Sequence, residues 1–207
     1  MMLSILALGF FLGLGIVSSP GVSMLFMVSE TLSKGFRNGL ACMFAQMSAD
    51  ALIIIPAAFL AGALPDEARS VLNVLGGIFL VFIGINGMRG ISKQKSIREN
   101  SNIKNRKILD SFVRAFGMHI TNFPVYLFWI AVGAGQMTKA QSACGTFCFL
   151  LFPIGFWIGG LLVETVIVAL VEKGKKPIGE KWIWRIRMIS SGIFIAAGIY
   201  LLSKTFI

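Results

Sequence analysis

Ionised residues are scarce in this chain. Only 14% of the 207 residues are Asp, Glu, Lys or Arg, while 56% are apolar. A soluble domain carries roughly 25% charged residues to cover its surface, so this composition excludes a soluble globular fold. The chain also has one histidine and three cysteines. An odd number of cysteines predicts no disulfide framework, and no cofactor motif is found, so no cofactor is expected.

The apolar residues that are present occur in long continuous blocks. A helix that spans a bilayer needs roughly 20 apolar residues, and six blocks approach or exceed this length. These blocks are Leu3–Val28, Asn38–Leu64, Val71–Met88, Phe112–Met137, Ser142–Val171 and Met188–Ser203. The sequence therefore predicts an all-α polytopic membrane protein with six transmembrane helices and no soluble domain.

The first block is expected to remain as a span. It has no basic start and runs without an ionised residue to Val28. A cleaved signal peptide begins with basic residues and has an apolar core of roughly 7–15 residues. The first block fits neither property.

The basic residues predict the orientation in the membrane. If six spans alternate, 16 of the 19 Lys and Arg residues fall on one side. They are Lys34, Arg37, Arg89, Lys93, Lys95, Arg98, Lys104, Arg106, Lys107, Arg114, Lys173, Lys175, Lys176, Lys181, Arg185 and Arg187. Because cytoplasmic loops hold the excess of Lys and Arg, we expect basic cytoplasmic loops at 89–114 and 172–187, with both termini outside a cell membrane. This topology explains the net charge of +10, so binding of nucleic acid is not expected.

A polar segment divides the chain into two groups of three spans. Residues 1–90 form the first three-helix half, 91–111 a basic cytoplasmic linker, and 112–207 the second half. An odd number of spans per half makes the two halves enter the membrane in opposite directions. This 3+3 inverted repeat is the common plan of secondary transporters.

Each half carries polar residues beside a proline within its first span. Proline breaks the helical hydrogen-bond ladder, and the freed carbonyls need partners in lipid. Such breaks near the midplane present backbone groups to a ligand, although a simple proline kink is the alternative. Because the breaks occur at corresponding places in both halves, they favour a binding site. The candidate residues are Ser19, Pro20, Gly21, Thr121, Asn122 and Pro124.

Asp50 is an isolated carboxyl group within an otherwise uncharged block. It lies 13 residues after Arg37 and 16 before Asp66, roughly 20 Å from either end of a helix. A carboxylate at this depth is costly unless it faces the bundle interior or a water-filled cavity. Asp50 could carry a proton or pair with an amine substrate, or it could bond structurally across helices. Gln46, one turn earlier, shares its helix face.

Two further titratable residues are candidates for the same site. Glu164 lies eight residues before Glu172, roughly 12 Å along a helix, so a position near the interface is an alternative to a cavity wall. His119 is the single histidine, one turn before Asn122. Its imidazole suits a proton relay, with a structural histidine as the alternative.

Small and sulfur-containing residues have simpler interpretations. Gly155 and Gly159 form a GxxxG pattern that allows close approach of helices, and we interpret it as packing within the chain. Cys144 and Cys148 share a helix face, but no third soft ligand lies near them in sequence. No metal site is therefore expected.

Together these motifs resemble the LysE/RhtB family of amino-acid exporters over most of the chain. The motifs are Pro20-Gly21, Gly35-Phe36-Arg37-Asn38-Gly39, Asp50, Gly76, Gly84, Arg89, Asn122 and Pro124. The resemblance implies a small integral membrane exporter of amino acids or related solutes, driven by protons and assembled as a homo-oligomer. Departures from the family pattern are Val22 after Pro20-Gly21, Ala49 before Asp50, and Phe123 between Asn122 and Pro124.

Three other functions remain open from the sequence. A divalent-metal exporter of the same superfamily would use Asp50, Glu164, His119 or the thiols as ligands. A membrane-embedded enzyme would need a nucleophile with a base, for which Ser18 or Ser19 with His119 is the candidate. A purely structural membrane protein is the third alternative.

Overall fold

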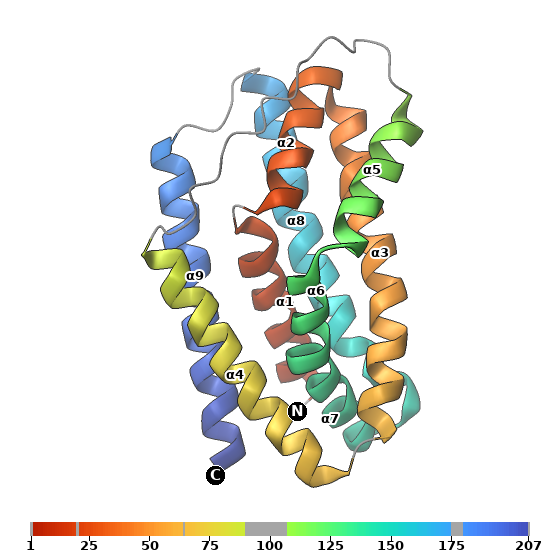
Figure 1. Cartoon of the computed structure of the whole chain (residues 1–207), viewed down its shortest axis with the longest axis vertical. Coiled ribbons are helices and arrows are strands. Elements are labelled where there is room, and N and C mark those ends of the chain that lie inside the picture. Colours follow the sequence, from red (N-terminus) through yellow and green to blue (C-terminus); the bar gives the residue numbers. More distant parts are fainter. Residues whose placement is uncertain (1, 20, 64, 90–106, 175–179, 207) are drawn as a thin grey trace.

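The structure is a computed structural model that describes residues 2–19, 21–63, 65–89, 107–174 and 180–206 (Figure 1). Within these ranges every regular element is a helix, which confirms the all-α prediction. The elements are α1 (Met2–Ser18), α2 (Val22–Lys34), α3 (Phe36–Ala63), α4 (Asp66–Met88), α5 (Ile108–Ile120), α6 (Phe123–Phe128), the π-helical η1 (Trp129–Gly133), α7 (Ala134–Cys144), the 3₁₀-helical η2 (Thr146–Leu150), α8 (Leu151–Gly174) and α9 (Glu180–Phe206).

Several helices have the length and composition of membrane spans. In the described part of the chain, Phe36–Phe59 and Phe147–Gly174 qualify as single helices. Two bent pairs qualify if each pair is one span: α1 with α2, bent by 65°, and α5 with residues 123–144, bent by 60°. The shorter apolar helices Val74–Met88 and Arg187–Ser203 complete the bundle.

Outward-facing side chains of these helices are large and apolar. Phe59 is 76% exposed and Phe82 on α4 is 61% exposed, and Leu162 and Leu170 on α8 are exposed as well. A soluble protein rarely exposes so many large apolar groups together. A lipid environment explains them, because hydrocarbon chains cover such a surface without cost.

Glycines bring α1 and α8 into close backbone contact. A Cβ atom on Gly9 or Gly13 would meet backbone atoms of α8, and one on Gly155 or Gly159 would meet backbone atoms of α1. Small residues at such positions permit the close packing that membrane helices rely on. The expectation that the GxxxG pattern packs within the chain is confirmed.

Two hydrophobic clusters fill the interior at different levels. One joins α1, α3, α4, α6, η1, α7, α8 and α9, with Leu12, Trp129 and Phe152 fully buried. The other joins α2, α3, α5 and α8, with Met27 and Val168 fully buried. Residues of both clusters border one internal cavity, so apolar packing lies on both sides of that cavity.

Helix boundaries differ from the predicted spans in several places. The first and fourth predicted spans are each split into bent segments. The fifth begins at the η2–α8 unit, because α7 continues to Cys144 and Gly145 then turns the chain. Helix α9 begins at Glu180 rather than Met188, since Lys, Arg and Glu are good helix formers beyond the apolar region. Of the predicted linker, 91–106 lies outside the described residues, and α5 begins at Ile108.

Each bent pair ends at a glycine, and the two glycines have the same backbone conformation. Gly35 follows α2 with φ of 93°, and Gly145 follows α7 with φ of 94°. Each backbone N–H donates to a carbonyl four residues earlier, that of Thr31 or Gln141, at 2.9 Å. Only glycine adopts this positive φ without strain, so both turns depend on it.

Candidate functional site

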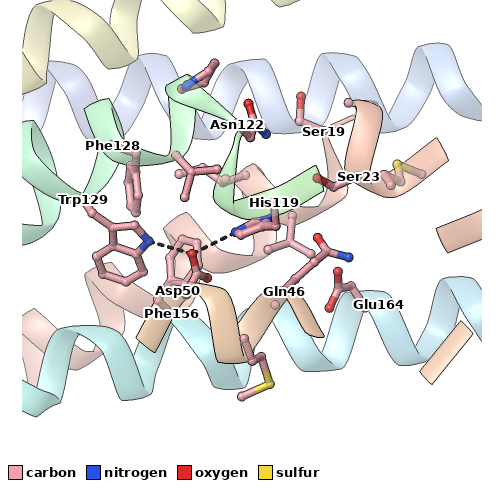
Figure 2. Close-up of a pocket in the computed structure, with 18 of the residues that line it drawn as sticks. Ser19, Ser23, Gln46, Asp50, His119, Asn122, Phe128, Trp129, Phe156 and Glu164 are labelled. Atoms are coloured by element: carbon pink, nitrogen blue, oxygen red, sulfur yellow. Dashed lines mark hydrogen bonds and ion pairs between the residues drawn. The ribbon is translucent and has the colours of Figure 1, made fainter. Parts of the chain in front are cut away.

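A cavity of about 230 Å³ lies where the two bent helices break (Figure 2). It is bordered by α1, α2, α3, α4, α5, α6, α8 and α9, together with η1. Eight of the ten predicted site residues line it: Ser19, Gly21, Gln46, Asp50, His119, Asn122, Pro124 and Glu164. The structure therefore brings together polar residues that are spread over 146 positions of the sequence.

Asp50 is held at the centre of this cavity by two side chains. The indole Nε1 of Trp129 donates a hydrogen bond to Asp50 Oδ1 at 2.9 Å. His119 Nε2 lies 3.0 Å from the same oxygen (Figure 2). Asp50 is only 6% exposed. These contacts come from α5 and η1, so the carboxyl group of α3 is bound across the interior of the bundle.

His119 occupies the last turn of α5, just before the break. Its side chain is buried and faces Asp50 rather than the membrane interface. Among the described residues, its Nδ1 atom has no hydrogen-bond partner. An imidazole bound to a carboxylate on one nitrogen and open on the other can exchange a proton between that carboxylate and the cavity.

Glu164 projects from α8 into the cavity and is 5% exposed. The structure thus places it in the cavity wall rather than at the interface. It shares the cavity lining with Asp50. Figure 2 shows it at the opposite end of the cavity from Trp129, together with Gln46. Within the described chain the Nε2 atom of Gln46 also lacks a hydrogen-bond partner.

The two breaks contribute unequally. Helix α2 begins after Gly21, with no side-chain cap among the described residues, and Gly21, Val22 and Ser23 line the cavity. At the second break Asn122 and Pro124 line it. Thr121 does not line it: its exposed hydroxyl donates to the carbonyl of Gly117 at 2.9 Å.

Pro20 lies outside the described residues. Pro124 is the second residue of α6 and follows the break at Thr121-Asn122. It therefore starts a new helix rather than kinking a continuous one, which is a favoured position for a residue without an N–H.

Sequence reasoning missed the aromatic part of the site. Phe128, Trp129 and Phe156 contact one another with ring centroids 5.1–5.2 Å apart. Trp157 and Ser23 also line the cavity. Of the four tryptophans, Trp129 and Trp157 are the two that fall inside predicted spans, away from their ends. Because tryptophan normally lies at the membrane interface, that depth was a usable signal.

A second buried polar cluster, also missed, joins α2, α3 and α5 outside the cavity. The hydroxyl of Ser111 donates to Glu30 Oε2, and Asn38 Nδ2 donates to Ser111 Oγ at 2.8 Å. Lys34 pairs with the same Glu30 carboxylate. The cluster connects α2 to α3 and α5 by hydrogen bonds.

The cysteines require a correction. Cys144 and Cys148 form a disulfide between α7 and η2, although the odd number of cysteines in the chain predicted no disulfide framework. The two cysteines lie on either side of the turn at Gly145 rather than on one continuous helix. Cys42 is a buried free thiol. Within the described ranges, no three His, Cys, Asp or Glu side chains are grouped to hold a metal ion.

Ser18 is not arranged as a nucleophile beside His119. Its hydroxyl lies 2.7 Å from Ser190 Oγ and donates to the carbonyl of Gly15. It therefore joins α1 to α9.

Apolar helices of spanning length, packed around a cavity with buried polar groups at two helix breaks, are typical of the class of membrane transport proteins. Within that class the chain matches the LysE type translocator family over residues 14–205, and it belongs to this family. The resemblance recognised from the sequence is confirmed. Membership indicates a membrane translocator. No curated protein and no solved structure gives a significant match.

Proposed function

We propose that this protein is a secondary transporter that exports amino acids or related small solutes across the cytoplasmic membrane in exchange for protons. The observation that carries this proposal is the cavity that contains the Asp50–His119 pair between two layers of apolar packing. A solute in this cavity lies at the breaks of the two bent helices, inside the helix bundle. Its export would proceed by rearrangement of the helices around it, as in alternating access.

Corresponding features of the two halves support a 3+3 inverted repeat. Each half begins with a bent pair that ends at a glycine with positive φ. Each continues with a long helix that carries a buried carboxyl group near its middle: Asp50 is residue 15 of α3, and Glu164 is residue 14 of α8. Helix α1 packs on α8 as α3 packs on α5 and α7. Exchanging the halves therefore preserves the main helix contacts.

The charges support a multi-pass topology with cytoplasmic basic loops. In Figure 1 the end of α2, the start of α5 and the end of α8 lie at the upper end of the molecule. These helix ends border the basic segments of the sequence. The disulfide between Cys144 and Cys148 lies at the opposite end of the molecule, where α7 ends. Because disulfides persist in oxidising compartments, that end suits the outside of the cell.

The polar groups of the cavity match a zwitterion. Glu164 offers a carboxyl oxygen to an ammonium group. Gln46 Nε2 and Trp157 Nε1 have no partner in the described structure and could donate to a carboxylate. The N-terminus of α2, at Val22, adds backbone N–H groups and the positive end of a helix dipole. An amino acid uses both kinds of group.

Proton exchange is assigned to Asp50 and His119. A carboxyl group and an imidazole can each bind one proton, and both side chains are buried. Proton-coupled carriers commonly use a carboxyl group within the bilayer, whose negative charge is neutralised when it binds a proton.

Efflux from loaded cells tests this function. Cells that make wild type, Asp50→Asn or Thr121→Ala at matched membrane levels are loaded with labelled amino acids, with and without a protonophore. We expect wild type and Thr121→Ala to export at least one amino acid, and both Asp50→Asn and the protonophore to stop it. Export by Asp50→Asn at the wild-type rate would contradict the assignment, and the absence of any amino-acid movement would contradict the cargo.

A further inference from the structure

The two carboxyl groups of the cavity have different surroundings. Asp50 already receives the indole N–H of Trp129 and lies against the imidazole of His119. Glu164 is equally buried, but no described side chain or backbone group is hydrogen-bonded to its carboxyl oxygens. A carboxylate without a partner is costly at bilayer depth. Glu164 is therefore the carboxyl group whose hydrogen-bond partner would be a ligand that enters the cavity.

None of the described residues that line the cavity is a lysine or an arginine that could pair with Glu164. The one histidine of the lining, His119, is bound to Asp50 through Nε2. The missing partner is thus a cation that comes from outside. A divalent metal ion would need several oxygen, nitrogen or sulfur ligands, and no such group of three acidic, histidine or cysteine side chains exists among the described residues. An organic ammonium group needs only one carboxylate and a few hydrogen-bond acceptors.

The other lining residues indicate the chemistry of the ligand beyond its ammonium group. Phe79, Ile83, Leu161 and Phe194 contribute apolar surface, and the aromatic cluster of Phe128, Trp129 and Phe156 closes one end. Aromatic faces attract cations and pack against aliphatic chains. A ligand with a second negative group beyond an α-carboxylate would be repelled by Asp50 and Glu164 together.

We propose that Glu164 is the ammonium-binding residue of this cavity, and that the site takes compact primary amines with an apolar, uncharged side chain. This inference rests on the proposed transport function and refines it. The ammonium group, rather than a carboxylate, is the feature that the site requires, because the carboxylate would meet only neutral donors such as Gln46 and Trp157.

Three probes with one hydrocarbon skeleton separate the possibilities. Leucine has both charged groups, 3-methylbutylamine lacks the carboxylate, and 4-methylpentanoate lacks the ammonium. Binding to the purified full chain in detergent is followed by intrinsic tryptophan fluorescence, since Trp129 and Trp157 line the cavity, and by calorimetry. We expect wild type to bind leucine and the amine, and 4-methylpentanoate to compete with neither.

Glu164→Gln removes the charge and keeps the shape of the side chain. It should weaken binding of leucine and of the amine roughly tenfold or more, as loss of a charge-assisted hydrogen bond does. Glu172→Gln, the same change two turns later on α8 and outside the cavity lining, is the matched control and should bind as wild type. Glu164→Asp should restore part of the affinity. Thermal unfolding of each variant shows that the fold is retained.

Several outcomes would overturn the inference. They are unchanged amine affinity in a folded Glu164→Gln, no binding of either amine-containing probe by wild type, or competition by 4-methylpentanoate as strong as that by leucine. The binding assay needs no gradient, so its failure is distinct from failure of the proposed function. If Glu164→Gln still exports and its affinity for the amine is unchanged, the proposed transport function is retained. The assignment of Glu164 as the ammonium-binding residue is then wrong.

Discussion

His119 Nε2 lies 3.0 Å from Asp50 Oδ1, although 69 residues separate the two in sequence. Asp50 belongs to α3, and His119 to α5. Movement of α3 against α5 would therefore change the contact between them. In the proposed proton exchange, the pair would link the protonation of the cavity to the arrangement of these two helices.

Replacement of His119 by glutamine should separate hydrogen bonding from proton exchange. Glutamine can still donate a hydrogen bond to Asp50, but it does not change charge near neutral pH. We expect export to fall to the background level while the protein stays folded. Efflux assays at matched membrane levels measure this, with Thr121→Ala as the control. Wild-type efflux by His119→Gln would show that the imidazole has no role in coupling.

Trp129→Phe should destabilise the protein through the loss of one hydrogen bond. Phenylalanine keeps ring contact with Phe156 but has no N–H for Asp50. Loss of a hydrogen bond to a buried charged group costs about 1–3 kcal/mol. Thermal unfolding in detergent measures the change. Trp157→Phe, whose N–H has no partner in the described structure, is the comparison and should cost less.

Gly159→Ala should weaken the packing of α1 against α8. Its Cβ would meet the backbone carbonyl of Phe10, which cannot move without shifting the helix. We expect a loss of about 1–3 kcal/mol, typical of overpacking. Gly192→Ala is the matched control, because nothing lies within 4 Å of its Cβ position. Alanine should there gain up to about 1 kcal/mol in helix propensity. Equal unfolding temperatures for the two variants would contradict this account.

Ser111→Ala should disrupt the polar cluster of α2, α3 and α5. It removes the donor to Glu30 and the acceptor for Asn38, both of which are buried. Asn38 Nδ2 would lose this partner and Glu30 would keep Lys34, so we expect a loss of about 1–3 kcal/mol. Ser48→Ala is the control, since the exposed Ser48 hydroxyl bonds only the carbonyl of Phe44 in its own helix. A similar unfolding temperature for both variants would argue against the cluster.

Alkylation of the denatured, unreduced protein should modify Cys42 alone. Cys144 and Cys148 are joined, and Cys42 is the free thiol. Mass spectrometry before and after reduction counts the modified cysteines and should find one and then three. Three modified cysteines without reduction would show that the disulfide is not formed in the protein studied.

Local hydropathy was sufficient to predict the apolar helices, although not all of their boundaries, and the burial of Asp50. Apolar blocks predict membrane helices because a segment in lipid needs apolar side chains and must satisfy its backbone hydrogen bonds within itself. This requirement does not depend on which other helices pack against it. Asp50 could be assigned to the interior for the same reason: it lies too far from either end of its block to reach water. Membership of the translocator family was also recognisable from short motifs, and the family match confirms it.

Tertiary structure decided which polar groups meet. Helices α3 and α8 are apolar on all sides, so their sequence does not reveal the inward face. Only the packing shows that His119 and Glu164 face the cavity, that Thr121 faces away, and that Trp129 binds Asp50. The turn at Gly145 likewise joins two cysteines that looked unpaired. The sequence by itself thus determined the membrane helices and their isolated carboxyl groups, whereas helix rotation and crossing, which depend on contacts between distant residues, decided their partners.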